Sequence, residues 1–138
     1  MDQVLVFDLG EERYGLEVGH IQEVADSPSL HYIPQAPAWL LGAINFHGQI
    51  LPVLDLCHFL DFPAGSHDPR KIVLAAEGAA LALAATAVHR IVPLAAEALL
   101  PFQGSPGRES FIRAVFHHQG RMINLLDLPR LLRRLAEA

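Results

Sequence analysis

The sequence predicts an all-β fold in which two small five-stranded barrels, related by an internal repeat, are accompanied by short helices and a C-terminal helix. Three observations lead to this prediction. Short stretches of alternating apolar and polar residues are separated by turn-forming residues, as in strands joined by tight turns. The pattern of the first half returns in the second. The composition, with 51% apolar and 18% charged residues, is that of a globular protein.

The N-terminal stretch predicts a β-hairpin. It reads "QVLVFDLGEERYGLEV", in which the alternation stops at residues 10–13 and resumes with Tyr14, Leu16 and Val18 on one face. The next stretch, which ends at Pro34, predicts a bend and then an extended segment. "QAPAWLLG" predicts a loop or one helical turn.

A second hairpin follows in "GAINFHGQILPVLDL". His47 and Gly48 supply its turn, because glycine takes the positive φ that such a turn needs. Pro52 has no N–H to donate, so we expect its strand to lie at an edge or to carry a bulge. Asp55 predicts the N-cap of a short helix that runs to Leu60.

The polar stretch "DFPAGSHDPRK", residues 61–71, predicts the connecting loop between two halves of a single domain that spans 1–138. Residues 1–62 are expected to form the first barrel and residues 70–138 the second. Closure into barrels removes exposed strand edges. Halves of this size would be marginal alone, so we expect them to share a core.

The second half repeats the order of the first. Val4–Phe7 corresponds to Ile72–Ala75, Ile21 to Val88, Pro34 to Pro101, Gly48 to Gly120, and the Leu-Asp-Leu at 54–56 to that at 126–128. The last stretch, "LDLPRLLRRLAEA", predicts a helix with Asp127 as its cap and Pro129 in its first turn. Its leucines form one apolar stripe, and we expect Arg130, Arg133 and Arg134 to form the solvated face opposite.

Composition excludes several classes of function. The net charge of −5 argues against nucleic-acid binding, which needs a basic face. The longest apolar-rich stretch, residues 79–88, is too short to span a membrane, and no leader opens the chain, so we expect no membrane insertion. Cys57 is the only cysteine, which excludes an internal disulfide and fits a reducing cytoplasm.

No catalytic motif is present for phosphate loops, dinucleotide binding, zinc proteases or hydrolases, so we expect no enzyme and no cofactor. The eight histidines leave two readings open. One is a metal site. The other, which we favour, is that they occupy turns and the surface, because no pair has metal-ligand spacing and His117 and His118 would point to opposite faces of a strand.

The hairpin "GAINFHGQILPVLDL" resembles the CheW-like domain family. The stretches "YGLEVGHIQEV", "YIPQAPAWLLGAIN" and "LLDLPRLL" are similar to the same family, so the resemblance covers nearly the whole chain. It implies a pair of SH3-like barrels and a non-catalytic adaptor or scaffold in bacterial chemotaxis, a form of two-component signal transduction. The implied partners are the regulatory domain of a CheA-type histidine kinase and the cytoplasmic tip of methyl-accepting chemoreceptors. The implied location is the cytoplasm, at membrane-associated receptor arrays.

The resemblance also implies a partner-binding region on the first barrel. Its candidate residues, matched position by position to the family pattern, are Glu23, Ile44, Asn45, His47, Gly48 and Gln49.

The chain departs from the family pattern at two places. His47 stands where the family has arginine, and Ala85-Thr86 stands where it has a Val-Asp pair. An imidazole cannot replace the bidentate fork of a guanidinium. These departures leave open a specialised system for pili, surface sensing or biofilms, or a regulator that binds the kinase without receptors. A small metal- or nucleotide-dependent enzyme that uses the histidines is the remaining alternative.

Overall fold

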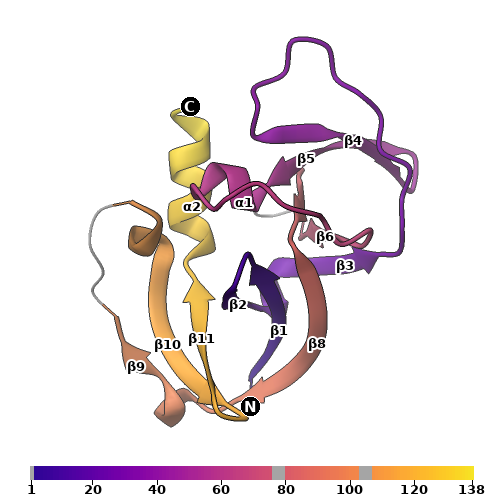
Figure 1. Cartoon of the computed structure of the whole chain (residues 1–138). Helices are drawn as coiled ribbons and strands as arrows, with labels where there is room; N and C mark the ends of the chain where they lie inside the picture. Colours follow the sequence, from indigo (N-terminus) through magenta and orange to yellow (C-terminus); the bar gives the residue numbers. More distant parts are fainter. Residues whose placement is uncertain (1, 76–79, 103–106) are drawn as a thin grey trace.

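The protein is described by a computed structural model that covers residues 2–75, 80–102 and 107–138, in which the strands form two mixed β-sheets (Figure 1). Sheet A contains, in spatial order, β8 (Ala87–Leu94), β1 (Asp2–Leu9), β2 (Glu12–Glu17), β11 (Arg121–Leu126), β10 (Ile112–His118) and β9 (Leu100–Pro101). Sheet B contains β3 (Ile21–Ala25), β6 (Lys71–Leu74), β7 (Ala82–Ala84), β5 (Gln49–Asp55) and β4 (Leu40–Phe46). The predicted all-β class is confirmed, and SH3-like closure stays a prediction.

The helical elements are short. They are α1 (Leu56–Phe59), α2 (Leu128–Ala136) and the 3-10 turns η1 (Val18–His20), η2 (Ala96–Ala98) and η3 (Arg108–Phe111). The predicted caps of both α-helices are confirmed, because the Asp55 carboxylate accepts from the His58 N–H at 3.3 Å and that of Asp127 accepts from the Arg130 N–H at 3.1 Å. In the described part of the chain, no helix is long and apolar enough to cross a membrane.

Each sheet is assembled from both halves of the sequence. The β1–β2 hairpin lies between β8 and β11 in sheet A, and the β6–β7 hairpin lies between β3 and β5 in sheet B. The sheets therefore do not coincide with the expected segments 1–62 and 70–138. The short η1 connection after β2 leads β3 into the other sheet, where it pairs with β6 through Val24 and Ile72.

The two sheets repeat the same pairing pattern. β2 runs parallel to β11, with Gly15 opposite Leu125, and β7 runs parallel to β5, with Ala82 opposite Val53. Individual hydrogen bonds repeat as well. The Asp55 N–H donates to the Trp39 carbonyl at 2.8 Å, and the N–H of Asp127 donates to the carbonyl of Phe111 at 2.7 Å. The internal repeat predicted from sequence is thus present in both strand order and backbone contacts.

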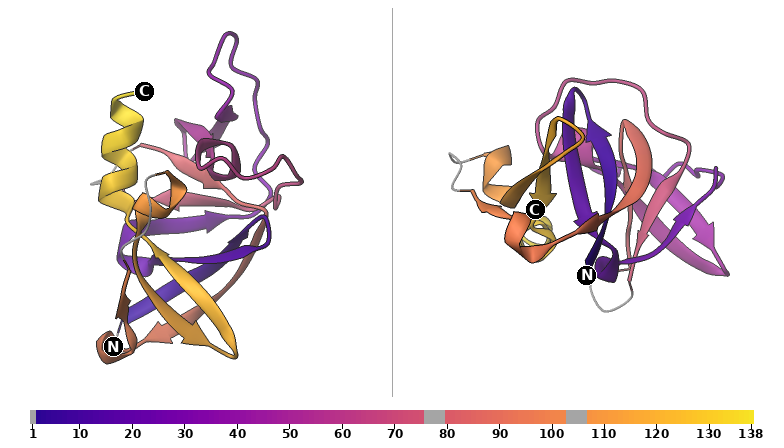
Figure 2. Two further views of the ribbon diagram at one scale, coloured as in Figure 1. Left: turned by 60° about the vertical axis from the view of Figure 1, so that its left-hand side comes forward. Right: turned by 90° about the horizontal axis from the view of Figure 1, so that it is seen from below.

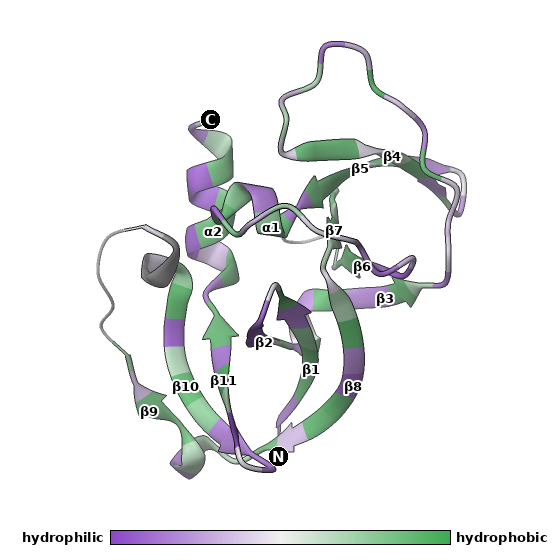
Figure 3. Cartoon of the chain, viewed as in Figure 1, coloured by the Kyte–Doolittle hydropathy of each residue, from purple (hydrophilic) through white to green (hydrophobic). Residues whose placement is uncertain are grey.

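The apolar residues form one large shared core and one smaller core within each sheet. The shared core joins strands of both sheets to both α-helices and contains Phe7, Tyr14, Leu54, Leu83 and Leu131. The predicted sharing of a core between the halves is therefore confirmed. Figure 3 shows green apolar stretches along the strands and alternating green and purple bands along α2, as expected for a helix with one buried face.

The connecting loop before β6 is fixed to the rest of the protein. Phe62 is buried in the shared core. The Asp68 N–H donates to the Ala85 carbonyl at 2.9 Å, and the Asp68 carboxylate accepts from the Val88 N–H at 2.7 Å. The buried Lys71 ammonium donates to the carbonyl of Asp68 at 2.8 Å. Despite its Pro- and Gly-rich sequence, this loop has a defined path.

Pro52 lies neither at an edge nor in a bulge of its own strand. β5 is an interior strand, and Pro52 faces Ala43 of β4, while the parallel pairing with β7 begins only at Val53. The register shift lies in β4, between Leu40 and Gly42. The expectation for Pro52 was therefore wrong, because a proline fits an interior strand at a position that needs no donor on that side.

Candidate partner-binding surface

The six predicted partner-binding residues all lie on sheet B, but they are not equally accessible. Glu23 is exposed on β3, Asn45 is exposed on β4, and His47, Gly48 and Gln49 are exposed around the β4–β5 turn. Ile44 is 0% exposed and packs in the core of sheet B. Neighbouring residues of a strand point to opposite faces, so Ile44 and Asn45 cannot both face solvent.

Glu23 and His47 come together although β3, which carries Glu23, and β4, which leads into the turn of His47, lie at opposite edges of sheet B. The Nε2 atom of His47 lies 3.4 Å from Oε1 of Glu23, and the two side chains are 70% and 50% exposed. Figures 1 and 2 show how the sheet curves until the end of β3 approaches the β4–β5 hairpin. The contact is open to solvent and therefore available to a partner.

The turn that presents His47 is built by three local features. His47 and Gly48 have φ values of 50° and 84°, as a type I′ turn requires, which confirms the predicted turn. The Gly48 N–H donates to Oδ1 of Asn45 at 3.0 Å. The ring of Phe46, which is buried, lies 4.3 Å from the imidazole of His47. The imidazole thus extends from a hydrogen-bonded turn and lies against the ring of Phe46.

Sequence reasoning missed Ile50, which is 64% exposed. In the β4–β5 ladder Ile50 is directly opposite Asn45, so both side chains lie on the outer face of sheet B. Counting the register outward from the turn at Gly48 would have placed it there. Ile50 gives the surface an apolar side chain next to its polar ones, as protein interfaces usually have.

Sheet A has an equivalent surface with different charges. At the positions that correspond to Glu23 and His47, Arg90 donates to the side-chain oxygen of Gln119 at 2.6 Å. Close by, the carboxylate of Asp8 accepts from Nε2 of His89 at 2.7 Å and from Nε of Arg13 at 3.0 Å.

These contacts affect the charge of Asp8. Its partial burial alone would raise the pKa of the carboxyl, but the hydrogen bonds from His89 and Arg13 outweigh burial and lower the pKa below its ordinary value. The carboxylate therefore stays ionised.

The histidines are accessible to solvent, as the sequence predicts for residues in turns and at the surface. None of the eight is buried. Among the described residues, no three His, Cys, Asp or Glu side chains are close enough together to hold a metal ion. Cys57 is buried, with its Sγ 3.2 Å from Oγ1 of Thr86.

The chain matches known proteins in sequence and in fold. A family model for the CheW-like domain matches residues 3–136. The chain belongs to the CheW-like domain family. A similar member is the chemotaxis protein CheW of Rhizobium meliloti (strain 1021), 27% identical over 130 residues that cover 91% of this chain and 84% of that protein. Another is the protein FrzA of Myxococcus xanthus, 30% identical over 132 residues that cover 91% and 82%.

The CheW-like fold is also found in a solved structure. The crystal structure of the scaffolding protein TtCheW from Thermoanaerobacter tengcongensis matches with a TM-score of 0.79 and 27% identity, covering 91% of this chain and 88% of that one.

The second departure from the CheW-like pattern has an internal role here. Ala85 is fully buried in the shared core. Thr86 accepts the N–H of Gly10 on its Oγ1 at 2.9 Å, and its own N–H donates to the carbonyl of Asp8 at 3.0 Å. Thr86 thus connects β1 and the turn that follows it to the segment before β8.

Proposed function

We propose that this protein is a non-catalytic adaptor that couples methyl-accepting chemoreceptors to a CheA-type histidine kinase in chemosensory signalling. The observation that carries the proposal is its membership of the CheW-like family over nearly the whole chain. The relatives include a chemotaxis protein and a scaffolding protein. On this proposal the protein acts in the cytoplasm, at receptor arrays.

The proposed partner-binding surface consists of Glu23, Asn45, His47, Gly48, Gln49 and Ile50. It combines a solvent-open polar contact with one exposed apolar side chain. Ile44 supports the surface from beneath. A stable interface buries roughly 1,000 Å² or more in total, so contacts with neighbouring residues of sheet B would have to complete it.

A second candidate function keeps the kinase as partner but not the receptor. Its basis is His47, which stands where the family pattern has arginine and makes only a long contact of 3.4 Å with Glu23. A guanidinium can hold a carboxylate with two parallel hydrogen bonds, whereas one imidazole nitrogen can make a single bond. Such a protein would occupy the kinase and regulate it, in a standard array or in a specialised system.

Calorimetry distinguishes these functions. The protein is titrated with the kinase regulatory domain and, separately, with a receptor cytoplasmic tip. Micromolar binding to both supports the adaptor, binding to the kinase domain alone supports the regulator, and binding to neither contradicts both. Glu23→Lys should then weaken receptor binding more than about tenfold, by reversing the charge at the contact. Glu97→Lys, an exposed acid on η2, is the matched control.

A further inference from the structure

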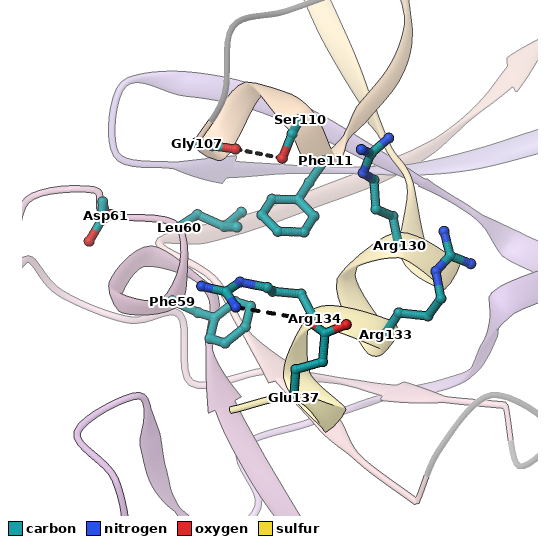
Figure 4. Close-up of a pocket in the computed structure, with 10 residues that line it drawn as sticks. All are labelled: Phe59, Leu60, Asp61, Gly107, Ser110, Phe111, Arg130, Arg133, Arg134 and Glu137. Atoms are coloured by element: carbon teal, nitrogen blue, oxygen red, sulfur yellow. Dashed lines mark hydrogen bonds and ion pairs between the residues drawn. The ribbon is translucent and has the colours of Figure 1, made fainter.

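A hollow lies away from the proposed partner-binding surface. It has a volume of about 600 Å³ and lies between the end of α1, the η3 turn and the side of α2 (Figure 4). Its wall carries Arg130, Arg133 and Arg134 of α2. It shares no residue with the surface around Glu23 and His47.

These arginines differ from the basic residues that form close ion pairs. Arg13 and Arg113, for example, are paired with Asp8 and Glu17 at 3.0 and 2.9 Å. The side chains of Arg130 and Arg133 make no hydrogen bond or ion pair within the described residues. Arg134 makes only a loose, exposed contact of 3.9 Å with Glu137. In a chain of net charge −5, three arginines without a close acidic partner among the described residues thus gather on one helix.

The floor of the hollow is aromatic. Phe59 and Phe111 line it, with ring centroids 6.5 Å apart. A second hollow of about 290 Å³ shares Phe59 and Phe111 and continues past Trp39. Trp39 and Phe59 stack edge to face at 5.6 Å. Together the two hollows form an elongated groove with an aromatic floor and a wall that carries the three arginines, and the acidic residues Asp61 and Glu137 also line it.

The arrangement of the guanidinium groups indicates the kind of occupant. Figure 4 shows Arg134 extending over Phe59, while Arg130 and Arg133 extend on the other side of the helix, away from Phe59. The three groups do not converge on one point, as they would to enclose a single phosphate. Several carboxylates along an extended peptide could each contact a different guanidinium group. The two N–H donors of a guanidinium fit the two oxygens of a carboxylate.

We propose that the groove along α2 binds an acidic peptide segment of a partner protein, with carboxylates on Arg130, Arg133 and Arg134 and an apolar side chain on Phe59 and Phe111. This surface is separate from the one assigned to the kinase and receptor. Arginines in the last turn also favour the helix dipole, a role that needs no partner. Binding measurements separate the two roles.

The test uses a fluorescent synthetic peptide in which glutamates alternate with leucines, titrated into isotope-labelled full-length protein and followed by NMR. Backbone signals of α1 and α2 should shift, while those around His47 stay in place. The double variant Arg130→Glu, Arg134→Glu should bind about tenfold more weakly, because it removes two charge pairs. A peptide with glutamine in place of glutamate should bind as weakly as this variant does.

The matched control is Arg121→Glu, which reverses an exposed arginine on the hairpin of sheet A. It should bind the peptide as the unchanged protein does. Equal weakening by Arg121→Glu, shifts spread over the whole surface, or no binding would overturn the proposal. Binding of phosphatidylglycerol vesicles through the same arginines without peptide binding would also overturn it, in favour of a membrane-facing helix. The experiment uses neither kinase nor receptor, so its result is independent of the adaptor function.

Discussion

Arg90 and Gln119 form a 2.6 Å hydrogen bond at the positions where the repeat places Glu23 and His47. Side chains at the same two positions of the repeat are thus in contact in both sheets. On sheet B the pair is a carboxylate and an imidazole, and on sheet A it is a guanidinium and an amide. The two ends of the molecule are alike in backbone and different in charge. A partner that selects by charge will therefore distinguish them.

The first prediction concerns His47. His47→Arg should strengthen binding of a receptor tip about five- to tenfold, because a guanidinium can hold Glu23 and still present donors to a partner carboxylate. Calorimetry against the receptor tip and the kinase regulatory domain measures this, and kinase binding should not change. Gln119→Arg, at the equivalent turn of sheet A, is the control. Equal gains in both variants would contradict a specific role for His47.

The second prediction compares the two helix caps. Asp127→Ala should lower the free energy of unfolding by about 1 kcal/mol, the usual cost of a lost cap. Asp55→Ala should cost more, about 2 kcal/mol, because the Asp55 carboxylate is also 3.0 Å from Nε2 of His67 and is largely buried. Urea unfolding measures both. If His67 accounts for the difference, His67→Ala will have almost no further effect once Asp55 is alanine.

The third prediction concerns acid stability through Asp68. The side chain of Arg70, followed by the backbone N–H groups of Val88 and Arg70, holds the pKa of this carboxyl at about 2, below the ordinary 3.8. A lowered folded-state pKa stabilises the fold above the unfolded pKa, and this contribution disappears as the pH falls from about 4 to about 2. Asp68→Asn should therefore destabilise the protein by about 1–2 kcal/mol at neutral pH and much less near pH 2.

Thermal unfolding across this pH range measures the effect of Asp68→Asn. Asp2→Asn, which changes an exposed carboxylate at the start of β1, is the control and should leave the profile unchanged. A constant difference between Asp68→Asn and the unchanged protein at all pH values would show that the loss comes from packing rather than from charge.

The fourth prediction concerns Gly42, which has a φ of 156°. A Cβ atom there would collide with the carbonyl oxygen of His31, which accepts the Ala43 N–H at 2.8 Å. Gly42→Ala should lower the free energy of unfolding by about 1–3 kcal/mol and loosen the segment before β4. Amide hydrogen exchange at Ala43 reports the loosening. Gly65→Ala, where a Cβ would meet nothing within 4 Å, should have little effect.

Local structure could be predicted from the sequence because its signals are local. The turn at His47 and Gly48 and the caps at Asp55 and Asp127 each depend on a few neighbouring residues. The repeat likewise shows in the sequence and in the pairing. The strands with which each hairpin pairs could not be predicted. The β1–β2 and β6–β7 hairpins have the same apolar pattern, so either could fill the gap in either sheet.

The candidate surface could be predicted only in outline. Matching positions identified Glu23 and His47, which the structure places 3.4 Å apart. The same matching included Ile44, which alternation along β4 places in the core. It passed over Ile50, whose exposure depends on the register of the hairpin. Curvature that brings the two edges of a sheet together depends on long-range packing, which no single stretch encodes.

The crossing of the hairpins between the halves makes the protein equivalent to an intertwined homodimer whose two subunits have become one chain. A single half would leave its third strand, β3 or β8, without the neighbour that the other half donates. The backbone hydrogen bonds of that strand could then be made only with a second copy of the half. The connecting loop, residues 61–70, joins the two halves covalently. Their association is therefore a first-order folding step that does not depend on protein concentration.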